Sequence, residues 1–129
     1  MTEKISNSQN GQALITLVIF IVVATTVITG AVAATIINSQ GTSKLAQSEE
    51  SLKIAEGGVE NAVLKLLKNP SYSGETLNIG TGTATITVTG TSTKTIVSTG
   101  TDGNFSRKIQ AMGTFANNAF TITSWNEIN

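Results

Sequence analysis

Four glutamates in the middle of the chain are the residues whose spacing could suggest a metal site or an acid and base pair. They are Glu49, Glu50, Glu56 and Glu60. Carboxylates in such a group can bind a divalent cation or transfer protons. Lysines 44, 53 and 65 are interspersed among them at helical spacing, and Glu49 precedes Lys53 by four residues, in the orientation that stabilises an exposed helix face. We therefore interpret the cluster as a solvated helix surface.

The composition excludes most other catalytic chemistry. The 129 residues include no histidine and no cysteine, so the commonest general base, the commonest zinc ligand and every disulfide are missing. There is also no nucleophile elbow and no glycine loop of the kind that binds phosphate. Eight basic and eight acidic side chains cancel, without the basic excess of a nucleic-acid-binding protein. We expect a protein that is not an enzyme, needs no cofactor or metal and makes no nucleic-acid contact.

An apolar segment near the amino terminus is the strongest feature of the sequence. Residues 13–37 carry no charge, and at about 1.5 Å per residue a helix of this length reaches about 37 Å, enough to cross a hydrocarbon layer of about 30 Å. The segment also contains five threonines, several alanines and Gly30, which let neighbouring helices approach closely. We predict one membrane-spanning helix that also packs against other helices.

The junction before this segment resembles a known processing site. A short polar leader, residues 1–11, ends in Gly11 and is followed by Gln12 and the sequence ALITL. This junction is similar to that of type IV pilin-like proteins, and the stretch AEGGVENA at residues 55–62 is similar to the end of the long helix in minor pilins and pseudopilins. The resemblance implies that a prepilin peptidase cleaves after Gly11 and methylates the new amine of Gln12. It also implies an assembly platform in the inner membrane as a partner.

Five residues of the segment are expected to contact neighbouring helices in a filament: Leu14, Thr16, Leu17, Phe20 and Gly30. Thr16 departs from the family pattern, because most members have a glutamate at this fifth mature position, where it is thought to meet the terminal amine of a neighbour. A hydroxyl accepts a hydrogen bond but brings no counter-charge. The lack of this glutamate is familiar among tip-type minor subunits and archaeal pilin-like chains, so Thr16 favours a tip subunit, whereas the small β domain favours a shaft subunit. Both roles stay open.

An amphipathic helix is predicted after a polar stretch at residues 38–43, which could end or bend the first helix. Apolar or small residues recur there at heptad spacing: Leu45, Leu52, Val59 and Leu66, with Ser48, Ala55 and Ala62 three residues after the first three. Pro70 ends this helix. Gly57 and Gly58 each cost about 1 kcal/mol in a helix interior, so we interpret them as a place where a sheet packs closely, with a hinge as the alternative.

The last sixty residues have the period of β-strands. Ala84, Ile86 and Val88 alternate with threonines, and further strands are expected at residues 94–98, 105–112 and 119–124. Asp-Gly and Asn-Asn turn signals separate them, so we predict an antiparallel meander of four or five strands.

This sheet has few large apolar side chains for its size, and a small sheet with one apolar face is marginal alone. We expect the helix to complete its core through five residues: Val59, Ala62, Val63, Leu66 and Leu67. The helix end is then needed for the sheet to fold.

These features predict an α+β protein in which a long amino-terminal helix packs on a small antiparallel sheet. Its parts are a leader at 1–11, a transmembrane and filament-core helix at 12–41, an amphipathic helix at 42–69 and a β domain at 70–129. We expect a structural subunit of a homo-oligomeric or mixed pilin filament. It would be a single-pass membrane protein before assembly and part of an extracellular filament or the cell envelope afterwards. The alternatives are an unprocessed membrane-anchored β domain for binding or adhesion, and a secreted domain cleaved near Ala34.

Overall fold

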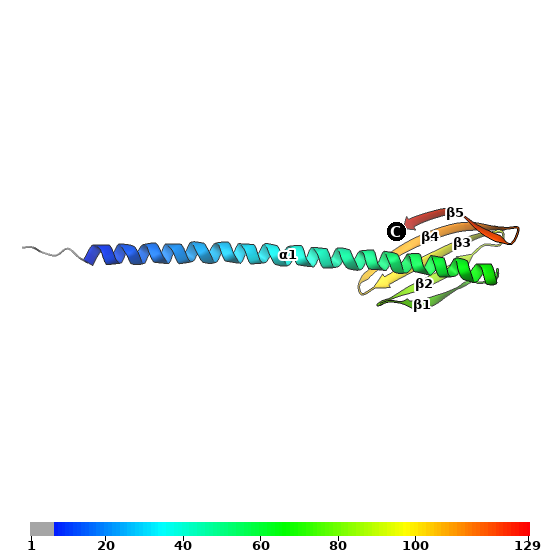
Figure 1. Ribbon diagram of the computed structural model, residues 1–129, viewed down its shortest axis with the longest axis horizontal. Helices are drawn as coiled ribbons and strands as arrows, with labels where there is room; N and C mark the ends of the chain where they lie inside the picture. Colours follow the sequence, from blue (N-terminus) through cyan, green and yellow to red (C-terminus); the bar gives the residue numbers. More distant parts are fainter. Residues whose placement is uncertain (1–6) are drawn as a thin grey trace, which may run out of the picture. The chain divides into compact units, whose positions relative to one another are not determined.

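The computed structural model describes residues 7–129 and contains one helix followed by five strands in that range (Figure 1). The elements are α1 (Asn7–Lys68), β1 (Gly74–Ile79), β2 (Gly82–Thr89), β3 (Thr93–Asp102), β4 (Phe105–Ala116) and β5 (Ala119–Ile128). The predicted α+β class is confirmed. Most of the predicted leader, residues 1–6, lies outside the described residues.

Helix α1 continues through the polar stretch at residues 38–43, where the sequence allowed an end or a bend. The hydroxyl of Thr42 donates to the carbonyl of Asn38 at 3.0 Å, so one of the polar side chains there is bonded within the helix. The chain nevertheless divides into two compact units, the first ending at Thr42 and the second beginning at Ser43. The second unit holds the remainder of α1 and the whole sheet.

The sheet is an antiparallel meander in which the strands lie in sequence order, β1-β2-β3-β4-β5. Asn117 and Asn118 both have positive φ and join β4 to β5 by a two-residue connection, as expected of a type I′ turn. Strands β3, β4 and β5 extend beyond the predicted ranges, and β1 was not delimited from the sequence. The ends that were not predicted have little apolar alternation and are ordered by pairing with the neighbouring strand.

One face of the sheet packs against α1 and forms the core of the second unit. Ala84, Ile86 and Val88 of β2 are buried there, while the threonines between them are exposed, as the alternation predicted. The rest of the buried core comes from α1, β3 and β4: Ile54, Ala55, Val59, Ala62, Leu66, Ile96, Ile109 and Ala111.

Three of the five helix residues predicted to complete the core, Val59, Ala62 and Leu66, are fully buried. Val63 is half-buried and packs against the core from the side. The prediction for Leu67 is wrong, because its side chain is 49% exposed. Leu67 follows Leu66 by about 100° around the helix, which turns it away from the sheet.

The helix and the sheet approach each other closely at two glycines. A Cβ at Gly58 of α1 would lie 2.1 Å from Ser98 Oγ of β3, and a Cβ at Gly100 of β3 would lie 2.1 Å from the carbonyl oxygen of Ser51. No side chain larger than hydrogen fits at these positions without movement. The interpretation of Gly58 as a close-packing residue is confirmed, and α1 continues through it without the alternative hinge.

Polar contacts also join α1 to the last two strands of the sheet, β4 and β5. Arg107 of β4 forms an ion pair with Glu127 of β5 and donates a second hydrogen bond, of 2.7 Å, to Ser48 Oγ on α1. The guanidinium beside Glu127 lowers the pKa of that carboxyl. One side chain therefore connects three elements.

Tyr72, the only tyrosine, provides a pH-dependent contact after the end of α1. Its hydroxyl donates to Glu75 Oε1 at 2.9 Å, and the same oxygen lies 3.4 Å from Lys65 Nζ. Burial and the bond to Glu75 raise the pKa of Tyr72 from 10.0 to about 12. Because the folded pKa is the higher one, this stabilisation is complete below pH 10 and is lost as the pH rises through about 12.

We expect the phenolate absorbance of the folded protein to titrate near pH 12, well above its titration in urea. Glu75→Gln should lower the midpoint only in part, because burial is the larger cause. Tyr72→Phe, the matched control, should remove the absorbance change and the corresponding fall in unfolding free energy. A midpoint near 10 in the folded protein would contradict the contact.

Candidate functional site

The apolar segment of α1 is the candidate functional site, and it belongs entirely to the first unit. Its large hydrophobic side chains are each 52–70% exposed: Leu14, Ile15, Leu17, Val18, Ile19, Phe20, Ile21, Val22, Val23, Val27, Ile28, Val32, Ile36 and Ile37. They occur on every side of the helix. Exposing an apolar surface of this size to water is unfavourable, so such a helix is normally covered by lipid or protein. α1 is long and apolar enough to cross a membrane, as a single-pass anchor requires.

The threonines of this segment are bonded within the helix. Five hydroxyls each donate to the carbonyl oxygen four residues earlier, at 2.7–3.0 Å: those of Thr16, Thr25, Thr26, Thr29 and Thr35. A hydroxyl without a partner would be costly in hydrocarbon, whereas one bonded to its own helix is not. The segment can therefore carry small polar side chains through a bilayer without needing a partner there.

Four of the five predicted assembly residues, all except Leu14, line one of two shallow hollows of the helix surface. Thr16, Leu17 and Phe20 line the first hollow, together with Gln12 and Ala13. These positions are three or four residues apart and so share one side of the helix. Leu14 is exposed but does not line this hollow.

The second hollow surrounds Gly30, where a Cβ would meet nothing within 4 Å. Its other lining residues are Thr25, Thr26, Thr29 and Ala33. All five are small, so a bulky side chain from another molecule could approach the helix backbone here.

The predicted processing junction is exposed and helical. Gly11 has open space around it, and the carbonyl of Gln12 accepts the hydrogen bond from Thr16 at 2.9 Å. Thr16 is thus bonded locally and supplies no charge to the segment. Cleavage and methylation at this junction remain predictions.

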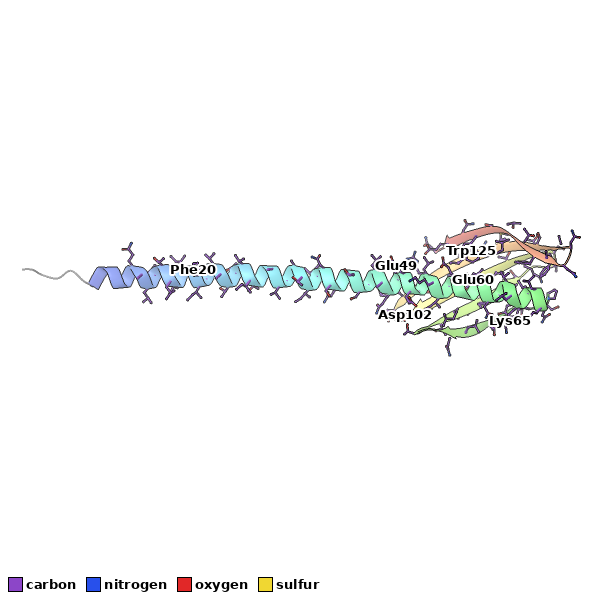
Figure 2. All side chains as sticks on the ribbon, viewed as in Figure 1. Phe20, Glu49, Glu60, Lys65, Asp102 and Trp125 are labelled. Carbon is purple, nitrogen blue, oxygen red and sulfur yellow. The ribbon has the colours of Figure 1, made fainter. Side chains whose placement is uncertain are left out.

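The four glutamates considered as a possible metal or acid–base site all lie on α1, where Figure 2 labels Glu49 and Glu60. Within residues 7–129, no three acidic, histidine or cysteine side chains lie close enough together to hold a metal ion. Glu49 and Glu60 are exposed and the other two are half-buried.

The structure also shows an apolar groove in the second unit that sequence reasoning missed. Glu60, Val63 and Leu64 of α1 line one wall, and Ile122 and Trp125 of β5 line the other. The last two face the same side although they are three residues apart in the chain, because a register shift near Met112 and Gly113 interrupts the alternation of the strand. The three-residue spacing of Ile122 and Trp125, in place of the two-residue spacing of a regular strand, was the only sign of this groove in the sequence.

Comparison of the chain with protein-family models, with curated proteins and with solved structures finds no match. The class of protein therefore rests on the structure itself. A long apolar amino-terminal helix and an antiparallel sheet that packs on its second part form a pilin-like arrangement, which fits a membrane-anchored protein.

Proposed function

We propose that this protein is a structural subunit of a type IV pilus-like filament. The observation that supports the proposal is the segment 13–37, which is apolar on every side and whose threonine hydroxyls are satisfied within the helix. Such a segment can lie in lipid and can equally be covered by other helices. A helix that served only as an anchor would not need so many small and hydroxylated residues.

A filament subunit must bury the same apolar surface in two settings, first in the bilayer and then among other subunits. The five threonines and Gly30 reduce the hydrophobicity of the span, which lowers the free energy needed to leave the lipid. Once lipid is gone, the hollow around Gly30 offers close van der Waals contact to a neighbour. Repeating one head-to-tail contact that does not close into a ring produces an open filament.

In this proposal a prepilin peptidase cleaves after Gly11, and the amine of Gln12 is methylated. An inner-membrane assembly platform then adds the subunit to a filament of this chain alone or of this chain with other pilins. The β domain forms the outer surface, and the protein moves from the membrane to an extracellular filament or the cell envelope.

The second candidate is a single-pass anchor that is never processed and holds the β domain at the membrane for binding or adhesion. The exposed apolar segment supports this function too. The two candidates differ in processing, because only the filament subunit loses its leader.

The test is the intact mass and the N-terminal fragment spectrum of the protein from its native cells. We expect a chain that begins at Gln12 with one added methyl group. A chain that still begins at or near Met1 would contradict the filament proposal and favour the unprocessed anchor. Cleavage near Ala34 would contradict both and indicate a secreted β domain.

A further inference from the structure

The groove between α1 and β5 brings together three of the five large apolar side chains that are exposed in the second unit, the other two being Leu45 and Leu67. It has a volume of about 290 Å³. Leu64 is 61% exposed, and Ile122 and Trp125 are 41% and 40% exposed. Figure 2 shows Glu60 on α1 and Trp125 on the neighbouring β5. Large apolar side chains exposed side by side, including an aromatic ring, are typical of a surface that binds a partner.

The charge in the groove limits which partner can bind. Glu60 is its only charged residue and forms no ion pair with any residue that the structure describes. Two copies joined groove to groove would bring two like charges to one contact, which is unfavourable. The apolar lining therefore favours an apolar partner surface, and Glu60 disfavours one that carries negative charge.

The same chain carries a surface with this chemistry. Residues 13–37 have no charge and are apolar on every side. When this segment leaves lipid, its apolar surface must be buried against another protein surface. The hollow around Gly30 is lined only by small residues, so it can receive the side chains of Leu64 and Trp125. Glu60 is exposed at the rim, where it can stay hydrated beside an uncharged helix.

We propose that the groove formed by Glu60, Val63, Leu64, Ile122 and Trp125 binds the apolar segment 13–37 of a second copy of this chain. This inference rests on the proposed filament function and names the contact that links its subunits. The groove and the segment are different surfaces of one chain, so each copy can bind one neighbour by its groove and another by its segment. Such a contact extends without closing.

Cysteine cross-linking in filaments from the native cells tests the contact, since the chain has no cysteine of its own. Leu64→Cys is combined in turn with a cysteine at each of positions 25, 26, 29, 30 and 33. We expect at least one pair to give a ladder of disulfide-linked dimers, trimers and larger species on oxidation. The matched control combines the same cysteines with Thr87→Cys, an exposed residue on the opposite face of the sheet, and should give no ladder.

A charge in the groove provides a second test that does not depend on cysteine geometry. Ile122→Glu should leave cleavage after Gly11 intact but reduce filament yield about tenfold or more, because a carboxylate then faces the apolar segment. Thr121→Glu adds the same charge on the other face of β5 and should assemble normally. Urea unfolding of both variants checks that they fold.

The outcomes separate this inference from the proposed function. Processed filaments that form no ladder, or that assemble normally with Ile122→Glu, would overturn the groove contact and leave the filament function standing. A chain that is neither processed nor assembled would overturn both.

Discussion

Gly100→Ala is expected to lower the free energy of unfolding of the second unit by about 3 kcal/mol. The added Cβ would lie 2.1 Å from the carbonyl oxygen of Ser51 and 2.4 Å from the amide nitrogen of Ala55. Both atoms belong to the backbone of α1, so no side-chain rotation can relieve the clash and the helix must move away from the sheet. Urea unfolding of the full-length protein in detergent, followed by the fluorescence of Trp125, the only tryptophan, measures the effect.

Gly57→Ala is the matched control for this prediction. A Cβ at Gly57 would lie 3.4 Å from the terminal methyl of Ile79, which is an ordinary contact. Because alanine favours a helix more than glycine does, this variant should be up to about 1 kcal/mol more stable than the native chain. Equal losses from Gly57→Ala and Gly100→Ala would contradict the close packing.

The effect of Gly58→Ala on the free energy of unfolding should lie between those of Gly100→Ala and Gly57→Ala, because its closest clash is with a side chain and not with the backbone. The Cβ would meet Ser98 Oγ at 2.1 Å and Ala84 Cβ at 3.0 Å. Ser98 Oγ is buried and, within the described structure, has no hydrogen-bond partner, so Ser98→Ala alone should be neutral or stabilising by about 1 kcal/mol. Combined with Gly58→Ala, it should recover about half of the loss. Strict additivity of the two changes would contradict this contact.

Gly11→Asp is expected to block processing, so that the full chain stays in the membrane fraction and no filaments form. The resemblance to pilin-like proteins implies that the peptidase recognises this glycine. Gly11 has open space around it, so the substitution does not disturb any packed contact, and a loss of cleavage would report on recognition and not on folding. Immunoblots of membrane and filament fractions, with intact mass analysis, give the result.

Gly41→Asp is the control for the processing experiment. Gly41 is also an exposed glycine of α1 with nothing within 4 Å of a Cβ, and it lies beyond the apolar segment. The same charge at this position, far from the cleavage junction, should leave cleavage unchanged. Normal filaments from Gly11→Asp would show that the cleavage site is wrongly assigned.

The sequence alone was sufficient for the features that depend on neighbouring residues. The charge-free run at residues 13–37 predicted a helix able to cross a membrane, and the period of two after Pro70 predicted an antiparallel meander. The heptad spacing also found Val59, Ala62 and Leu66 in the core. Each signal is a local pattern in the sequence, either a long apolar run or a regular spacing of apolar residues, and such patterns indicate secondary structure directly.

Only the tertiary structure decided which surfaces are covered. The contact of Gly100 with Ser51 joins residues far apart in the chain, and the exposure of Leu67 depends on which side of the helix the sheet covers. The groove exists because the irregular pairing of β5 turns Ile122 and Trp125 to one side, next to a part of α1 that the sheet leaves uncovered. Periodicity shows that a side chain is apolar and which face it occupies. Whether that face is buried depends on the position of a partner element, which no local pattern contains.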